Sequence, residues 1–294
     1  MRSCFQAAGK IALLAALLSA ASPLNAASLA PFKDELFAYP GILSAEGETY
    51  KVVDYNEMRD INGRDEVPER RALGKYVATG VRGAQRELVL KSDAGEVRHV
   101  AVGKADGASI ITLYLHGQGG SRRQGVDDFT FGGNFNRIKN LMAGNGGLYL
   151  SPDFPDFGER GAAQIAALIA HYKQRSPQAR VYVACGSMGG ALCWALARDP
   201  AMTGTVSGYL LLGSLWDESF LSSPAFKART PVFFGQGSKD VVFPVEKQEA
   251  FFRSILKKAP GYPARFVRFE TGTHGTPIRM TDWRDTLNWM LSVR

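Results

Sequence analysis

The stretch Val181-Tyr-Val-Ala-Cys185-Gly-Ser187-Met-Gly189-Gly190 decides the fold. An apolar run meets a tight turn with a serine at its tip, and a segment rich in alanine and leucine begins at once. Small neighbours let the backbone bend sharply there, which holds a hydroxyl out from the turn for attack. The free N–H groups and positive dipole end of the following helix favour a developing oxyanion. Ser187 is therefore a candidate nucleophile, although a serine that only caps the helix fits the same letters.

Cys185 stands where the common pattern G-x-S-x-G has its first glycine. Cysteine is small and apolar, so we expect the turn to close all the same. A cysteine two residues before the serine is a second candidate nucleophile by residue type. We reject it, because it ends a predicted buried strand and lies off the tip of the turn.

Around this turn, apolar β-rich runs alternate with helical patterns from Ala84 onward. Such alternation is typical of a mostly parallel sheet with helices on both faces. The turn 93–95 should join the first two strands into an antiparallel hairpin. The predicted strands are 86–91, 96–102, 109–115, 147–150, 180–184, 207–212, 231–235 and 265–270, and the predicted helices are 134–143, 161–175, 188–198, 245–258 and 282–291.

Two later loops supply the acid and the base that a serine nucleophile needs. Asp240 follows the seventh strand and His274 follows the eighth, so both lie at carboxyl ends of strands, where open sheets form their crevice. Asp217 after the sixth strand is an alternative acid, but its position suits the N-cap of a short helix better. The other three histidines fall in a strand, on a helix and before a glycine loop, and these are His99, His171 and His116.

The strand 109–115 runs into His116-Gly117-Gln118-Gly119-Gly120. A glycine-rich turn lets backbone N–H groups approach a substrate oxygen closely. We expect the N–H groups of Gln118 and Met188 to form an oxyanion hole. Phosphate binding is the competing interpretation, but the sequence has neither a P-loop nor a full G-x-G-x-x-G. His116 is expected to be a packed, hydrogen-bonded loop residue.

Four motifs now stand in order: the His-Gly loop, the serine turn, G-x-x-D-x-x-x-P at 237–244 and Gly-x-His at 272–274. From about Arg86 to the C-terminus the chain resembles the α/β hydrolases, which include esterases, lipases, thioesterases and some peptidases. The resemblance implies an α/β fold with eight strands and helices on both faces. It also implies ester hydrolysis through an acyl-enzyme, with Ser187, Asp240 and His274 as the triad, no cofactor and no metal.

The superfamily does not fix the substrate. An acyltransferase, a thioesterase or a peptidase would use the same triad, and a non-catalytic binding protein on a hydrolase scaffold is a further alternative. The segment 214–230, where many relatives carry a long cap, is short, so we expect a minimal cap. The candidate substrate-binding residues are Trp216 and Phe220 in that segment, Arg122 with Arg123 after the glycine loop, and Phe129, Phe131 and Phe135. Ordinary packing, or a solvated loop for the arginines, is the alternative for each.

The first residues have the pattern of an export signal. Arg2 and Lys10 flank a polar start, and the apolar run 11–21 is followed by small residues. The run is shorter than the roughly 20 residues that span a bilayer. We expect residues 1–26 to be a cleaved secretory signal, with an uncleaved anchor or a buried helix as alternatives. The mature protein is then periplasmic or secreted, with 27–83 as an extension packed on a catalytic domain at 84–294. One strand is predicted in the extension, at Tyr50–Val53.

Composition limits the partners of this chain. It has 294 residues, is 45% hydrophobic and 21% charged, and carries a formal charge of +7, which is typical of a globular protein. Loss of Arg2 and Lys10 with the signal would lower +7 by two, to +5. The basic residues are scattered without a nucleic-acid motif, which argues against nucleic acid as a partner. No later segment predicts a membrane span. The hydrolase resemblance implies a small-molecule or envelope-derived acyl substrate.

Two cysteines remain after the signal, Cys185 and Cys193. Cys185 should end a strand, and Cys193 should lie nearly two turns into the helix that packs back over the sheet. A helix axis lies about 10 Å from a sheet, whereas a disulfide needs Cα atoms within roughly 7 Å. The sequence therefore predicts free thiols.

Overall fold

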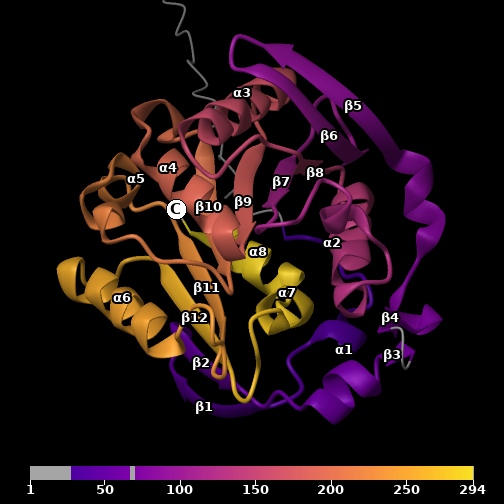
Figure 1. Cartoon of the computed structure of the whole chain (residues 1–294), viewed down its shortest axis with the longest axis vertical. Helices are drawn as coiled ribbons and strands as arrows, with labels where there is room; N and C mark the ends of the chain where they lie inside the picture. The colour runs from indigo at the N-terminus through magenta and orange to yellow at the C-terminus, as the bar shows by residue number, and fades with distance from the viewer. Residues whose placement is uncertain (1–27, 67–69, 294) are drawn as a thin grey trace, which may run out of the picture.

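A computed structural model describes residues 28–66 and 70–293 of the chain (Figure 1). The predicted signal at 1–26 lies outside these residues. A ten-stranded mixed sheet runs through the molecule in the order β1-β2-β12-β11-β10-β9-β7-β8-β6-β5. Its strands are β1 Ile42–Glu46, β2 Tyr50–Val53, β5 Gln85–Ser92, β6 Gly95–Gly103, β7 Ile110–Leu115, β8 Leu148–Pro152, β9 Arg180–Gly186, β10 Val206–Leu212, β11 Val232–Gly237 and β12 Ala264–Phe269.

The centre of the sheet is parallel and its edges are antiparallel. Neighbouring strands from β8 through β7, β9, β10, β11 and β12 to β2 all pair in parallel. The β5–β6, β6–β8 and β1–β2 pairs are antiparallel. The central strands are buried on both faces, which explains why they read as continuous apolar runs in the sequence.

The chain order reverses at the middle of this sheet. From β7 the chain passes to β8 on one side, and then to β9 on the other side and onward to β12. In open α/β sheets the binding crevice forms outside the carboxyl ends of the strands at such a switch point. The loops that follow β7 and β9 are therefore the expected place for a site.

Helices cover both faces of the sheet, as predicted. One hydrophobic layer is formed under α3, α4, α5 and α6, and the other under α2, α7 and α8. The helices are α1 Asp34–Phe37, α2 Asn134–Gly144, α3 Glu159–Arg175, α4 Gly190–Arg198, α5 Pro224–Lys227, α6 Val245–Lys258, α7 Thr276–Met280 and α8 Trp283–Ser292. In the described ranges no helix has the length and apolar character needed to cross a bilayer.

The eight predicted strands are present as β5 to β12, and the segment 28–83 adds two further strands to the sheet. Its hairpin β1–β2 extends the sheet beyond β12, and two short strands, β3 Asp65–Glu66 and β4 Arg71–Ala72, pair with each other (Figure 1). The strand at Tyr50–Val53 was predicted. The strand β1 was missed because all five of its residues are exposed, so it carries no alternation of apolar and polar side chains.

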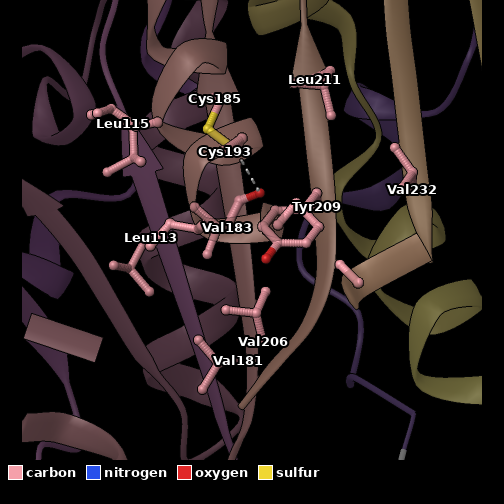
Figure 2. Close-up of a cluster of buried hydrophobic side chains, with 14 of the residues drawn as sticks. Leu113, Leu115, Val181, Val183, Cys185, Cys193, Val206, Tyr209, Leu211 and Val232 are labelled. Atoms are coloured by element: carbon pink, nitrogen blue, oxygen red, sulfur yellow. Dashed lines mark hydrogen bonds between the residues drawn. A yellow bond between two sulfur atoms is a disulfide. The ribbon is translucent and has the colours of Figure 1, made fainter. Parts of the chain in front are cut away.

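Cys185 and Cys193 are joined by a disulfide, so the prediction of free thiols was wrong (Figure 2). Their Cα atoms lie 6.4 Å apart. A Cα on the inner side of a helix lies about 2 Å closer to the sheet than the axis does. The helix also approaches unusually closely, because a Cβ at Gly189 or Gly190 would collide with the carbonyl of Leu115 or the hydroxyl of Ser214.

The disulfide should stabilise the turn that carries Ser187, because it joins residues on either side of it. For a sequence separation of 8, loop-closure entropy predicts that Cys185→Ala/Cys193→Ala lowers the free energy of unfolding by about 2–3 kcal/mol. Urea unfolding of the oxidised protein and the double variant measures this. Alkylation of the denatured protein without reductant should add no label at these two positions, and two labels would contradict the bridge.

Candidate functional site

Ser187 lies at the tip of a sharp turn between β9 and α4. Its φ is +52°, a left-handed conformation that is costly for a residue with a Cβ and that gathers at functional sites. The single turn η6 (Ser187–Gly189) leads directly into α4. A Cβ at Gly117 would lie 2.7 Å from the Ser187 Cβ, so the loop after β7 passes the serine as closely as a glycine allows. The predicted strand–turn–helix is thus present, and its serine is half-buried.

The structure brings Ser187, His274 and Asp240 together in one hydrogen-bonded chain. His274 Nε2 lies 2.9 Å from Ser187 Oγ, and His274 Nδ1 lies 2.8 Å from Asp240 Oδ2. An ionised carboxylate only accepts, so Nδ1 carries the hydrogen and Nε2 is free to accept the serine proton. The three side chains come from the ends of β9, β11 and β12, as predicted.

Asp240 is buried and fully hydrogen-bonded. Burial alone would raise the pKa of its carboxyl, but hydrogen bonds from His274 and from the backbone N–H groups of Phe243 and Val242 lower the pKa below its usual value. The Val242 and Phe243 N–H groups donate to Oδ1 at 2.8 and 3.0 Å. Gln236 Nε2 donates to Oδ2 at 2.8 Å. The carboxylate is therefore ionised at neutral pH and fixed in orientation.

Asp217, the alternative acid, caps a short helical turn, as its position in the sequence suggested. It is the N-cap of the single turn η8 (Glu218–Ser222) and accepts from the Ser219 N–H at 2.9 Å. It also forms an ion pair with Arg198. Its carboxylate is used by these contacts, and His274 is oriented by Asp240 instead.

The two predicted oxyanion donors belong to the segments that meet at the nucleophile. Met188 follows Ser187 in the first turn before α4, where N–H groups have no partner within the helix. Gln118 follows Gly117, which contacts Ser187, and its N–H makes no backbone hydrogen bond to any residue that the structure describes. The loop is closed by the Gly120 N–H, which donates to the Gly117 carbonyl at 3.1 Å. Both N–H groups are thus available at the turn.

His116 is a packed loop residue, as expected. Its ring stacks on Phe154 at 4.2 Å between centroids, and Nδ1 lies 2.9 Å from the Gly117 carbonyl. Burial lowers its pKa, so the ring is neutral at pH 7.

The predicted substrate wall at Phe220 was wrong. Phe220 is fully buried and packs between Trp194, at 5.1 Å, and Phe226, at 5.6 Å. The turn η8 directs this side chain into the core, a direction that a short irregular segment does not reveal in its sequence. Trp216 is half-buried against the same core, and its contact with substrate stays a prediction.

Arg122 is committed to carboxylates of the protein rather than free for an anionic substrate. Its guanidinium pairs with Asp153 at 2.6 Å and with Glu87 at 3.1 Å. The backbone N–H of Arg122 also donates to Asp153 Oδ1 at 2.6 Å. The acidic partners lie far away in the sequence, which is why the pairing was not foreseen.

Two phenylalanines border His274. Phe243 lies 5.6 Å from the imidazole between ring centroids, and the Phe131 ring would lie 3.5 Å from a Cβ at Gly275, the residue after His274. Phe131 was among the predicted candidates, whereas Phe135 is buried in the core and Phe243 was missed. The available signal was the apolar run Val241-Val242-Phe243 directly after Asp240. Val241 is 92% exposed and Val242 52%, so the loop after Asp240 presents apolar side chains to solvent.

An open groove of about 530 Å³ lies between α3, α4 and the segment 215–217, and neither the triad residues nor the two predicted oxyanion donors line it. Its wall includes Phe157, Ala162, Ala191, Ala195 and Leu215, and its rim includes Glu159, Arg198 and Asp217.

Among the residues that the structure describes, no group of three or more His, Cys, Asp or Glu side chains is arranged to hold a metal ion.

The chain matches no known family model and no curated protein, so its likeness to known proteins lies in the structure. A putative alpha/beta hydrolase of unknown function from Agrobacterium tumefaciens matches with a TM-score of 0.55, 16% identity and coverage of 69% of this chain and 93% of that one. A Pyrococcus furiosus esterase matches with a TM-score of 0.50, 15% identity and coverage of 70% and 90%. A Xanthomonas campestris serine hydrolase, described as lacking a lid, matches with a TM-score of 0.50, 14% identity and coverage of 70% and 93%. These likenesses show that the chain has the α/β-hydrolase fold.

Proposed function

We propose that the protein is a serine hydrolase that cleaves carboxylic esters through an acyl-enzyme. The observation that carries the proposal is the hydrogen-bonded chain from Asp240 through His274 to Ser187. Ser187 stands at a strained turn and at the switch point of the sheet, where the turn holds a nucleophile out from the backbone. Esterases among the structural neighbours support the same class of activity.

In this mechanism His274 Nε2 accepts the Ser187 proton while Oγ attacks the acyl carbonyl. The carbonyl oxygen becomes negatively charged, and the N–H groups of Gln118 and Met188 stabilise it. Asp240 holds the imidazole in the productive tautomer and stabilises its cation. His274 then donates the proton to the departing alcohol, which leaves Ser187 acylated. Water, deprotonated by His274, attacks the acyl-enzyme and releases the carboxylic acid and the free serine.

The proposed substrate has an acyl group of short or medium length. Phe243 beside His274 and the exposed valines Val241 and Val242 in the loop after Asp240 offer apolar surface next to the triad. The segment 214–230 is anchored by the buried side chains of Phe220 and Phe226, so it provides no hinged cover. One structural neighbour, the Xanthomonas campestris serine hydrolase, is likewise described as lacking a lid.

We expect hydrolysis of soluble short-chain esters without activation at a lipid interface. Interfacial activation depends on a lid that opens, and the segment in that position is packed into the core. Rates should be measured on p-nitrophenyl esters of two to twelve carbons, below and above the critical micelle concentration. A sharp rise above that concentration would contradict the expectation.

A wider substrate panel separates ester hydrolysis from its alternatives. Thioesters test for a thioesterase, amides for a peptidase, and an added acceptor alcohol for an acyltransferase on the same triad. A folded protein that is inactive on all of them would favour a binding protein on a hydrolase scaffold.

We further propose that the protein acts outside the cytoplasm, in the periplasm or the medium, on a small or envelope-derived acyl substrate. The signal-like residues 1–26 and the Cys185–Cys193 disulfide support this, because disulfides persist in oxidising compartments. The catalytic unit in this proposal is 84–294, which contains all three triad residues. Fractionation of expressing cells tests the location, and sequencing of the mature N-terminus tests whether the signal is cleaved.

A further inference from the structure

The helix after His274 is held by a buried ion pair with the segment 28–83. α7 begins two residues after His274 and carries Arg279. Arg279 Nη1 and Nη2 donate to the two carboxylate oxygens of Asp65 at 3.0 and 2.6 Å. The Asp65 side chain is 0% exposed and that of Arg279 8% exposed. Arg279 Nη1 also donates to the Asp60 carbonyl at 3.2 Å, so the guanidinium is fixed from several directions.

The same guanidinium supports the other wall beside His274. A Cβ at Gly132 would lie 2.7 Å from Arg279 Nη1, so the single turn η5 (Phe131–Gly133) rests directly on the arginine. Phe131 in that turn has a φ of +49°, and its ring borders Gly275. Arg279 therefore lies beneath both the turn that carries His274 and a phenylalanine that flanks it.

The segment 28–83 also holds the stretch that leads into His274. The Glu270 N–H donates to the Val53 carbonyl at 3.0 Å, and the Thr271 hydroxyl donates to the Tyr55 carbonyl at 3.1 Å. The turn 270–279 is thus bound by this segment before His274 and, through Asp65, after it. On its other side the core contributes Asn134, whose side-chain amide donates to the Ile278 carbonyl at 2.8 Å.

A buried ion pair gives geometric specificity more reliably than stability, because desolvation offsets most of its attraction. A bidentate arginine–carboxylate pair fixes both distance and orientation. We infer that Asp65 and Arg279 are positioning residues, and that through them the segment 28–83 sets the place of the His274 imidazole against Ser187. The inference rests on the proposed function only for its effect on turnover. It gives the part of the segment around Asp65 a positioning role, whereas the part around Asp34 only packs on α2 and α8.

The test compares Asp65→Asn with a matched control, Asp34→Asn. Asp34 ties the same segment to the core through Arg137 and Arg284, at 3.1 and 2.7 Å, but on α2 and α8 rather than on α7. Asp65→Asn should lower kcat about 10- to 100-fold with KM within about twofold, because small misplacements of a catalytic group cost that much. Asp34→Asn should keep kcat within about twofold of wild type. Both are assayed on p-nitrophenyl acetate well below their melting temperatures.

A second readout does not depend on any substrate. In full-length protein with ¹⁵N-labelled histidine, the His274 Nδ1–H bonded to Asp240 should give a downfield proton resonance. Asp65→Asn should broaden or shift this resonance, and Asp34→Asn should leave it in place. A change in the resonance without measurable esterase activity in wild type supports the positioning role and contradicts the proposed function. Conversely, an unchanged resonance and an unchanged kcat in Asp65→Asn overturn the inference.

If Asp65→Asn does not fold, the double variant Asp65→Leu/Arg279→Met replaces the pair with apolar side chains of similar size, which buried pairs often tolerate. We expect it to fold and to keep the fall in kcat and the altered resonance. Wild-type kcat in this folded double variant would overturn the inference, as would equal losses of kcat in the Asp65 and Asp34 variants.

Discussion

Replacing Ser187 with alanine is expected to lower ester turnover on the order of a millionfold, the usual cost of removing a triad nucleophile. The fold should persist, because among the described residues the Ser187 hydroxyl is hydrogen-bonded only to His274, at 2.9 Å. The Ser187 carbonyl keeps its hydrogen bond from the Ser214 hydroxyl at 2.6 Å. Alanine also has the same Cβ, so the strained turn is neither relieved nor worsened.

The measurement is kcat/KM of Ser187→Ala on p-nitrophenyl acetate, with circular dichroism and a melting curve beside wild type. The control is Ser214→Ala, which removes a neighbouring hydroxyl outside the triad. Its turnover should fall far less than that of Ser187→Ala. Near-wild-type turnover in the Ser187 variant would refute the nucleophile.

The second large effect is expected for Asp240→Asn, about 10⁴-fold in turnover. An asparagine oxygen can still accept the Val242 and Phe243 N–H groups, which now bond to Asp240 Oδ1. Its amide nitrogen then faces His274 Nδ1 and donates to it, which leaves the hydrogen on Nε2. In that tautomer His274 has no lone pair for the Ser187 proton.

Asp217→Asn is the matched control, because Asp217 ends a neighbouring loop and is the other candidate acid. It caps η8 and pairs with Arg198, so its loss should cost about 0.5–2 kcal/mol of stability at most and leave turnover near wild type. Turnover and melting temperature are measured for both variants. An inactive Asp217 variant together with an active Asp240 variant would show that the acid is Asp217, after β10, and not Asp240, after β11.

The parts of this structure that follow from local patterns were predictable. The central strands are apolar runs because both faces are covered, and α6 was predicted with the bounds it has. Ser187, Asp240 and His274 stand in short motifs at strand ends, and the topology of a switched parallel sheet brings such ends together. For these residues the turn chemistry and the chain order were sufficient.

The errors arise where tertiary contacts decide. The disulfide depends on how closely α4 approaches β9, which Gly189 and Gly190 set through contacts with other loops. The inward turn of Phe220 depends on the aromatic cluster around Trp194. The strand β1 is exposed at the edge of the sheet and has no periodic signal. None of these is encoded in the neighbouring residues of the chain.

The most direct test of the central claim is labelling with a fluorophosphonate, which reacts with an activated serine and needs no knowledge of the natural substrate. The purified protein is treated with the probe, digested and analysed by mass spectrometry. We expect one adduct, on the peptide that contains Ser187, absent in Ser187→Ala and formed much more slowly in Asp240→Asn. A folded wild-type protein that gains no adduct, or gains it on another residue, would contradict the account.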